Sequence, residues 1–258
     1  MWGGRLDAPQ RKSRIGRGTQ WRAYYRASTM VSKLRLMTAN LLNGRADARH
    51  FAEVLDRVRP DLLVTQEMGP DAAEVIASRF SHHDLWPALD HRGRGIGCRF
   101  DAKFGTLDLP WRPGSWARVD IESTKLVVAG VHMLNPIEFP WWRSVPGRRQ
   151  QVEALLLWAD HTISQGEAVV VAGDMNATPR WPLYRRLNQR WDDLVLMAGD
   201  GSANKPAQTW GWRPGWPRLL RIDHVFGSGV EPVGTTVERL EGSDHVALVV
   251  DLQVGPRK

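Results

Sequence analysis

The feature that most constrains the fold is a series of short apolar runs, each of β-strand length and each ending in a polar side chain. Four of them read KLRLMTAN, DLLVTQE, KLVVAGVH and EAVVVAGD, at residues 33–40, 61–67, 125–132 and 167–174. Apolar runs of this length, bounded by polar or turn residues, are typical of buried strands. No run approaches the roughly 18 apolar residues of a membrane-spanning helix, so we expect no integral membrane span.

Helical patterns lie between these strands. Apolar residues recur at helical spacing over residues 48–58, and residues 70–80 open with a proline that suits a first helical turn. Residues 148–164 and the short stretch 182–187 complete the expected helices. The alternation of helices and strands predicts an α/β fold.

Further strand-like segments occupy residues 94–100, 115–122, 219–226, 234–240 and 245–254. Turn signals such as PWRPG and EST separate neighbouring segments, and this pattern favours antiparallel pairing. Each half of the chain is rich in strands and also carries helices. We therefore expect a four-layer α/β/β/α sandwich, in which two mixed, mostly antiparallel sheets pack face to face and helices lie outside.

The first 29 residues differ from the rest of the chain. They are rich in Arg and Gly, lack apolar periodicity and contain no hydrophobic core of a signal peptide. We predict a flexible basic tail over residues 1–29 and one domain over residues 30–258. Two alternatives stay open for the tail: translation that starts at Met30, and a basic arm whose aromatic side chains stack on bases.

The charge of the chain favours acidic partners. Thirty-five Lys and Arg residues against 28 Asp and Glu residues give a formal net charge of +7, and the isoelectric point is near 10.1. Such a surface attracts polyanions, because Arg and Lys that meet phosphate release condensed counterions. An Arg-rich composition with a solvated basic face explains the same numbers, so charge alone identifies no substrate.

The chain has a single cysteine, Cys98. One cysteine excludes an intrachain disulfide and a multi-cysteine zinc site, which fits a reducing compartment, and we expect a cytoplasmic location. The surrounding pattern RGIGCRF favours a buried small hydrophobic residue over a catalytic thiol.

The heptad GDMNATP, at residues 173–179, follows an apolar strand directly. Asp174 and Asn176 point to the same side if the strand continues, and the ends of buried strands often carry functional sites. A helix cap or an Asx turn before Pro179 is the structural alternative. The other strand ends favour the functional interpretation, because polar residues recur there, namely Asn40, Glu67, His132, Asp223, Asp244 and His245.

This set combines carboxylates, amides and two histidines, without cysteine. Oxygen-rich sets of this kind match the coordination of Mg²⁺ or Mn²⁺ beside groups for acid and base catalysis. A phosphodiester repels hydroxide, so its hydrolysis requires a cation, an aligned water molecule and donors aimed at the developing charge. The residue types at the strand ends can meet all three requirements.

Six motifs, in order along the chain, resemble those of the endonuclease/exonuclease/phosphatase superfamily, which includes abasic-site endonucleases, DNase I, inositol polyphosphate phosphatases and sphingomyelinases. The motifs are TANLLNG, LLVTQE, VAGVHMLN, VVAGDMNATP, LRIDHVF and GSDH. The resemblance covers residues 33–253, nearly all of the chain outside the tail. It implies the four-layer sandwich and divalent-metal-dependent hydrolysis of phosphoesters.

The resemblance also implies a metal end of the site. Glu67 corresponds to the principal metal-binding carboxylate, and Asn40 corresponds to the amide that supports this end. Asp244 corresponds to the acid near the metal or its water shell. Mg²⁺ or Mn²⁺ is the implied cofactor.

At the catalytic end, Asp174 corresponds to the residue that orients or deprotonates the attacking water, and Asn176 corresponds to the residue that contacts the phosphate. His245 corresponds to the histidine that stabilises charge on the phosphoryl oxygens. Asp223 corresponds to the carboxylate that pairs with that histidine, and such a pair favours the charged form of the imidazole. His132 occupies a position near the phosphate where relatives carry histidine or tyrosine.

The substrate stays open at the level of sequence. The basic charge and two tryptophan-rich stretches favour nucleic acid, with Trp111, Trp116, Trp141 and Trp142 in one stretch and Trp210, Trp212 and Trp216 in the other. Stacking on bases, gripping a lipid head group and core packing are all open roles for these rings. We predict a monomeric phosphodiester hydrolase that acts on nucleic acid. The alternatives are a phosphomonoesterase or a lipid-head-group phosphodiesterase that uses the same site, acting on a phosphorylated small molecule or a lipid head group, and an inactive nucleic-acid-binding module.

Overall fold

A computed structural model of the chain describes residues 32–122, 124–137, 140–198 and 206–255. Their strands form two six-stranded sheets. In order across the first sheet, the strands are β11 (Val230–Arg239), β12 (Val246–Val254), β1 (Ser32–Asn40), β2 (Leu62–Gln66), β4 (Arg94–Cys98) and β3 (His82–Trp86). Only β1 and β2 pair in parallel in this sheet.

The second sheet repeats this arrangement. In order, its strands are β5 (Ala102–Leu107), β6 (Gly114–Ile121), β7 (Thr124–His132), β8 (Ala168–Asp174), β10 (Asp223–Ser228) and β9 (Asp192–Asp193). The strands β7 and β8 pair in parallel, and the other pairs are antiparallel. Both sheets are therefore mixed and mostly antiparallel, as the sequence predicts.

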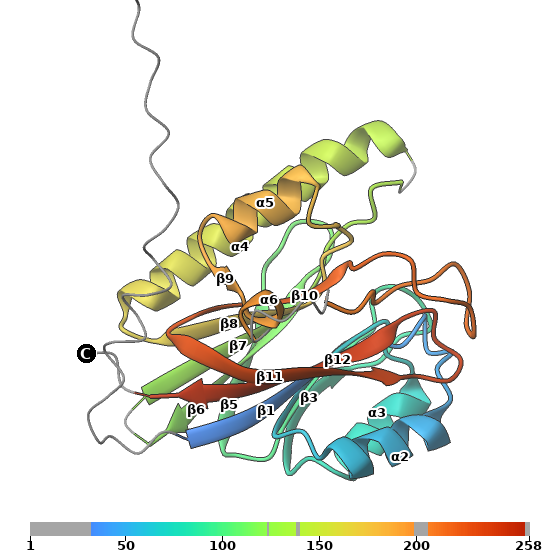
Figure 1. The fold of residues 1–258 in the computed structure, drawn as a ribbon, viewed down its shortest axis with the longest axis horizontal. Helices are drawn as coiled ribbons and strands as arrows, with labels where there is room; N and C mark the ends of the chain where they lie inside the picture. Colours follow the sequence, from blue (N-terminus) through green and yellow to red (C-terminus); the bar gives the residue numbers. More distant parts are fainter. Residues whose placement is uncertain (1–31, 123, 138–139, 199–205, 256–258) are drawn as a thin grey trace, which may run out of the picture. The chain divides into compact units, whose positions relative to one another are not determined.

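Helices lie on the outer faces of the two sheets (Figure 1). Two of them, α2 (Ala48–Val58) and α3 (Pro70–Ala77), pack on the first sheet. Two others, α4 (Trp141–Ser164) and α5 (Pro182–Asn188), pack on the second sheet. The short α6 (Leu194–Met197) follows β9. The predicted four-layer α/β sandwich is confirmed.

Alternation along the central strands explains why these strands are apolar throughout. In β8, Val170 and Ala172 pack in the core between the sheets, whereas Val169 and Val171 pack under the helices. Both faces of the strand are buried, so neither set of alternating positions can be polar. The polar residues are displaced to the strand ends, and this positions the site.

The structure differs from the sequence patterns in five elements. The predictions omit β3, β5, β9 and α6, and α4 begins at Trp141 instead of residue 148. Pro146 and Gly147 indicate a helix break, yet both lie within α4. A side chain at position 147 would collide with Leu134, so the glycine permits close packing of the helix there.

Two further predictions concern the termini and the cysteine. The predicted tail over residues 1–29 lies outside the described residues. Among the described residues, no helix is both long and apolar enough to cross a bilayer. Cys98 is fully buried, and burial raises the pKa of its thiol to about 11, so the sulfur behaves as a small apolar group.

Candidate functional site

The eight polar residues predicted from the strand ends lie at one edge of the two sheets. The parallel pairs β1/β2 and β7/β8 both end at this edge, and β10 and β12 run the opposite way and begin there. Strand direction therefore brings together residues that are far apart in sequence. The eight are Asn40, Glu67, His132, Asp174, Asn176, Asp223, Asp244 and His245.

Asn40 holds two carboxylates in place. Its buried Nδ2 donates hydrogen bonds to Glu67 Oε1 and Asp174 Oδ2, both at 3.2 Å. Its Oδ1 accepts a hydrogen bond from the Leu42 backbone N–H at 3.0 Å. Asn40 therefore orients the two acidic groups.

Two residues of the site adopt left-handed backbone conformations. The φ angle is +54° at Glu67 and +46° at Asn176, in the region that non-glycine residues seldom occupy. Glu67 follows the last residue of β2, and its Oε2 accepts a hydrogen bond from the Asn43 backbone N–H at 2.9 Å. Such strained conformations persist where surrounding contacts enforce them, and they cluster at functional sites.

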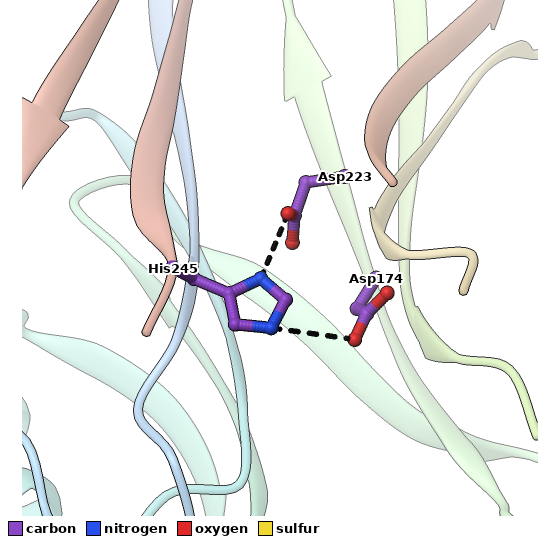
Figure 2. Close-up of side chains that lie close together, drawn as sticks. All are labelled: Asp174, Asp223 and His245. Carbon is purple, nitrogen blue, oxygen red and sulfur yellow. Dashed lines mark hydrogen bonds and ion pairs between the residues drawn. The ribbon is translucent and has the colours of Figure 1, made fainter. Parts of the chain in front are cut away.

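His245 lies between two buried carboxylates (Figure 2). Its Nδ1 donates a hydrogen bond to Asp223 Oδ2 at 2.8 Å, and its Nε2 lies 3.9 Å from Asp174 Oδ2. Burial lowers the pKa of His245, but the charge and hydrogen bond of Asp223 outweigh burial and raise it to about 10. The imidazole is therefore charged at neutral pH and its Nε2–H points toward Asp174.

Asp174 combines burial with a pKa close to neutrality. Burial, and then the negative charge of Asp223, raise the pKa of Asp174 to about 7, although His245 and a hydrogen bond from the Asn176 backbone N–H oppose the rise. A carboxylate with such a pKa can accept a proton near neutral pH and release it again. Asn176 Nδ2 also donates to Asp174 Oδ2 at 3.3 Å and to Met133 O at 3.0 Å.

His132 is held in the neutral form. Burial, and then the charge of Arg112, lower the pKa of His132 well below its usual value. The guanidinium Nη1 of Arg112 donates to His132 Nε2 at 2.8 Å, and this nitrogen lies 3.6 Å from Glu67 Oε1 and from Asp174 Oδ2. A neutral histidine and a guanidinium thus face the carboxylates.

Three further residues contact the site. Two of them, Arg112 and Arg148, are absent from the sequence prediction, and Trp210 is named there only among the tryptophans of open role. Arg112 lies in the PWRPG segment, which indicates only a turn. Buried Arg148, in α4, donates to Asn176 O at 2.9 Å and also to Leu134 O. Trp210 Nε1 donates to Asp244 Oδ2 at 3.0 Å. None of the three lies at a strand end in the sequence pattern, which is the signal that identifies the other eight.

The residues that could hold a cation form the oxygen-rich part of the site. Asp174, Asp223 and His245 offer ligand atoms within 4.8 Å of one another, but a charged imidazole cannot ligate a metal, and Asp223 is engaged by it. Asp244 Oδ1, in contrast, is buried without a hydrogen-bond partner among the described residues. The carboxylates of Glu67 and Asp244 are therefore the candidate oxygen ligands for a hard divalent cation.

The comparisons with known proteins identify the family of the chain. The model of the endonuclease/exonuclease/phosphatase family matches residues 37–245, so the chain belongs to this family, whose members are generally phosphoester hydrolases. No curated protein matches the chain in sequence.

Several solved structures share the fold. An endonuclease/exonuclease/phosphatase from Beutenbergia cavernae DSM 12333 is 22% identical, with a TM-score of 0.68 over 86% of this chain and 72% of that chain. Truncated Caenorhabditis elegans TDP2 is 20% identical, with a TM-score of 0.65 over 85% and 97% of the two chains. The human Nocturnin catalytic domain with bound sulfate is 16% identical, with a TM-score of 0.64 over 85% and 94%. At these identities the likeness concerns the fold.

Proposed function

We propose that the chain is a divalent-metal-dependent phosphodiester hydrolase that acts on nucleic acid. The observation that carries the proposal is the pairing, within one buried cluster, of Asp174 with the charged His245 at 3.9 Å. A carboxylate with a pKa near neutrality and a cationic donor are the two protein groups that phosphoester hydrolysis requires beside a cation.

Glu67 and Asp244 would hold the cation, with Asn40 fixing the position of Glu67. The donor set supports Mg²⁺ or Mn²⁺, because carboxylate oxygens are the ligands these ions prefer and the set contains no cysteine. The bound ion would neutralise charge on the phosphoryl oxygens and lower the pKa of a coordinated water molecule.

The remaining residues would act on the water and on the phosphoryl group. Asp174 would orient the attacking water and accept its proton. Asn176 and His245 would donate hydrogen bonds to the phosphoryl oxygens, where negative charge develops in the transition state. Asp223 would keep His245 charged and correctly turned. His132, with Arg112 beside it, would lie near the phosphate as a neutral group.

The basic charge of the chain supports nucleic acid as the substrate class. A lipid head group is the second candidate, and a specific observation favours it. Leu89 and Ile137, in loops that follow β3 and β7, are 74% and 79% exposed near the site. Exposed aliphatic side chains around a site are a feature of surfaces that contact membranes.

A substrate panel tests the proposal. It would contain abasic duplex DNA, single-stranded DNA, sphingomyelin and inositol phosphates, each assayed with Mg²⁺ and with EDTA. We expect hydrolysis of a nucleic acid that EDTA abolishes and that falls at least about a hundredfold in Asp174→Asn or His245→Gln.

Glu67→Ala is the matching metal-site variant, and Glu74→Ala, at an exposed position on α3, is its control. The control should retain native turnover, whereas Glu67→Ala should lose it. Hydrolysis that persists in EDTA, or a native rate in Glu67→Ala, would contradict the metal-dependent mechanism. Hydrolysis of sphingomyelin alone would assign the site to lipid head groups.

A further inference from the structure

The exposed tryptophans of the described residues all lie on segments at one edge of the sheets. Six tryptophan side chains are 36% to 65% exposed, although tryptophan is usually largely buried. We call this set the tryptophan rim, and it consists of Trp86, Trp111, Trp142, Trp181, Trp212 and Trp216.

Topology places the rim at the edge of the sheets that carries the candidate site. Trp86 ends β3, which runs parallel to β2 because both pair antiparallel with β4. Trp111 lies in the hairpin from β5 to β6, which turns at the end of β7 where His132 lies. Trp142 lies in the first turn of α4, which follows β7.

The other three rim residues flank β8 and β10. Trp181 follows the end of β8, beyond Asp174. Trp212 and Trp216 precede the start of β10. The loops and helix ends that carry the rim therefore all leave or enter the sheets where the catalytic candidates gather.

Direct contacts link the rim to the site. The ring of Trp212 lies 5.9 Å from that of Trp210, whose Nε1 donates to Asp244. On the other side, the Arg148 guanidinium lies 5.8 Å from the ring centroid of Trp181 and donates to the Asn176 carbonyl. Each of these rings is thus one side chain away from a candidate catalytic residue.

Guanidinium groups accompany three of the rim rings. Besides Arg148 on Trp181, Arg94 lies 5.1 Å from the Trp86 centroid and Arg213 lies 5.8 Å from the Trp216 centroid. A cation near one face stabilises the ring position, and Arg94 and Arg213, which are not buried, can also supply a charge for a phosphate. The rings stay at least 36% exposed, so they also offer apolar surface to a ligand.

We propose that the tryptophan rim binds unpaired bases of a single-stranded nucleic acid, so that the substrate phosphodiester lies next to unpaired nucleotides. Indole rings stack on bases of any sequence, and neighbouring guanidinium groups bind the backbone. Bases within a duplex stack on each other and present no free face to these rings. The position of the substrate phosphodiester beside unpaired nucleotides rests on the proposed function, whereas the binding of bases by the rim does not.

A membrane is the competing occupant, since Leu89 and Ile137 are exposed beside the rim. Three of the six rings, however, carry a guanidinium within 5.8 Å of the centroid. Inserting these rings among acyl chains would draw the charges toward the hydrocarbon, which is costly. Arginine beside aromatic rings is instead the combination that single-stranded nucleic acid binds.

Fluorescence anisotropy with a labelled oligothymidylate tests the inference. The full chain is titrated in EDTA, so that binding is measured without hydrolysis. Loss of a stacked ring weakens binding about tenfold, so the double variant Trp212→Leu/Trp216→Leu should bind at least about tenfold more weakly. Leu157→Ala is the matched control, because it removes an exposed apolar side chain of α4 outside the rim. It should bind as the native chain does.

A duplex of the same length and a vesicle that contains phosphatidylserine complete the test. Equal affinity for duplex and single strand, or native affinity in the double variant, would overturn the inference. Vesicle binding that depends on the rim, without oligonucleotide binding, would assign the rim to membranes. If circular dichroism shows that the double variant does not fold, two measurements replace it. Arg213→Gln should weaken binding of the oligonucleotide, and the oligonucleotide should quench the tryptophan fluorescence of the native chain.

These outcomes are separable from those of the proposed function. Oligonucleotide binding that depends on the rim, with no hydrolysis of any panel substrate, would refute the enzyme proposal and leave the rim inference standing. Metal-dependent hydrolysis of a panel substrate, with rim variants that bind every nucleic acid as the native chain does, would support the enzyme proposal and refute the rim inference.

Discussion

Replacing Asp223 with asparagine tests the electrostatic basis of the site. The carboxylate of Asp223 accepts a hydrogen bond from His245 Nδ1 at 2.8 Å, and both side chains are at most 5% exposed. Asparagine has the same shape and its Oδ1 can still accept this bond, so the variant removes the charge and preserves the contact. We expect His245 to lose most of its preference for the charged form.

The size of the effect follows from the separation of the two charges. Unit charges about 4 Å apart interact by about 4 kcal/mol at an effective dielectric constant of about 20. Since one pKa unit corresponds to about 1.4 kcal/mol, Asp223→Asn should lower the pKa of His245 by about 3, from about 10 to about 7. At pH 8 only about a tenth of the molecules would then carry the imidazolium.

Nuclear magnetic resonance of histidine labelled with ¹³C measures this pKa directly. The His245 resonance is assigned by its loss in His245→Gln, and the titration is run in EDTA. Asp71→Asn, which removes an exposed acid on α3, is the control and should leave the His245 titration unchanged. In parallel, turnover at pH 8 should fall at least about tenfold in Asp223→Asn, in proportion to the lost imidazolium.

Two results would refute this reasoning. The first is a His245 resonance that titrates at the same pH in the native chain and in Asp223→Asn. The second is a large fall in turnover at a pH where the histidine of the variant is still fully charged. The first result would show that Asp223 does not set the charge of His245. The second would show that turnover does not depend on the charge of His245.

Three further predictions concern the cation, the fold and the pH dependence of stability. Glu67→Gln should lower the affinity for Mg²⁺, measured by calorimetry, at least about tenfold, since loss of even an outer-shell partner of a metal costs about that much. Unchanged binding would place the cation elsewhere. Arg221→Leu leaves buried Asp193 without the guanidinium that lies 2.7 Å from it, so urea denaturation should show a loss of about 3–5 kcal/mol; a native unfolding midpoint would contradict this. Because the pKa of His245 rises from 6.5 to about 10 on folding, its stabilisation is complete below pH 6.5 and is lost as the pH rises to 10. The melting temperature of the native chain should therefore fall more over this window than that of His245→Gln, and parallel curves in calorimetry would contradict the shift.

Most of the candidate site could be predicted from the sequence for a simple physical reason. Strands buried on both faces can carry polar residues only at their ends, so residues such as Asn40 and Asp174 mark those ends. The sequence motifs give the order of the strands along the chain. The parallel pairs β1/β2 and β7/β8 then bring the polar strand ends to one edge of the sheets. The roles of the individual residues remain proposals, because proximity shows which groups can cooperate and does not show what each group does.

The features of the site that the sequence pattern misses are contacts from segments other than strand ends and one backbone conformation. Arg112 and Arg148 reach the site from a hairpin and from a helix, and no periodicity distinguishes them from surface arginines. The left-handed conformation of Glu67 is equally hidden, since glutamate has no preference for it. The edge strand β3 was missed because its HHDLW sequence is half-exposed and polar, as edge strands often are.

The strand β10 shows how the same alternation supports the site from behind. Asp223 and His224 are neighbours, so their side chains point to opposite faces of the sheet. Asp223 faces His245, whereas His224 Nε2 donates to the Ala177 carbonyl at 2.7 Å, within the loop that carries Asn176. Behind His224, buried Asp193 accepts hydrogen bonds from Tyr184 and Arg221, both at 2.7 Å.

This arrangement ties the loop after β8, which carries Asn176, to a network of residues that lies outside the candidate site. The loop after β8 is fixed on one side by Asp174, which accepts the Asn176 backbone N–H at 2.7 Å, and on the other by His224. Asn176 can hold its left-handed conformation because both supports act on adjacent residues. The position of the amide that would contact the phosphate therefore depends on contacts made by α5, β9 and β10.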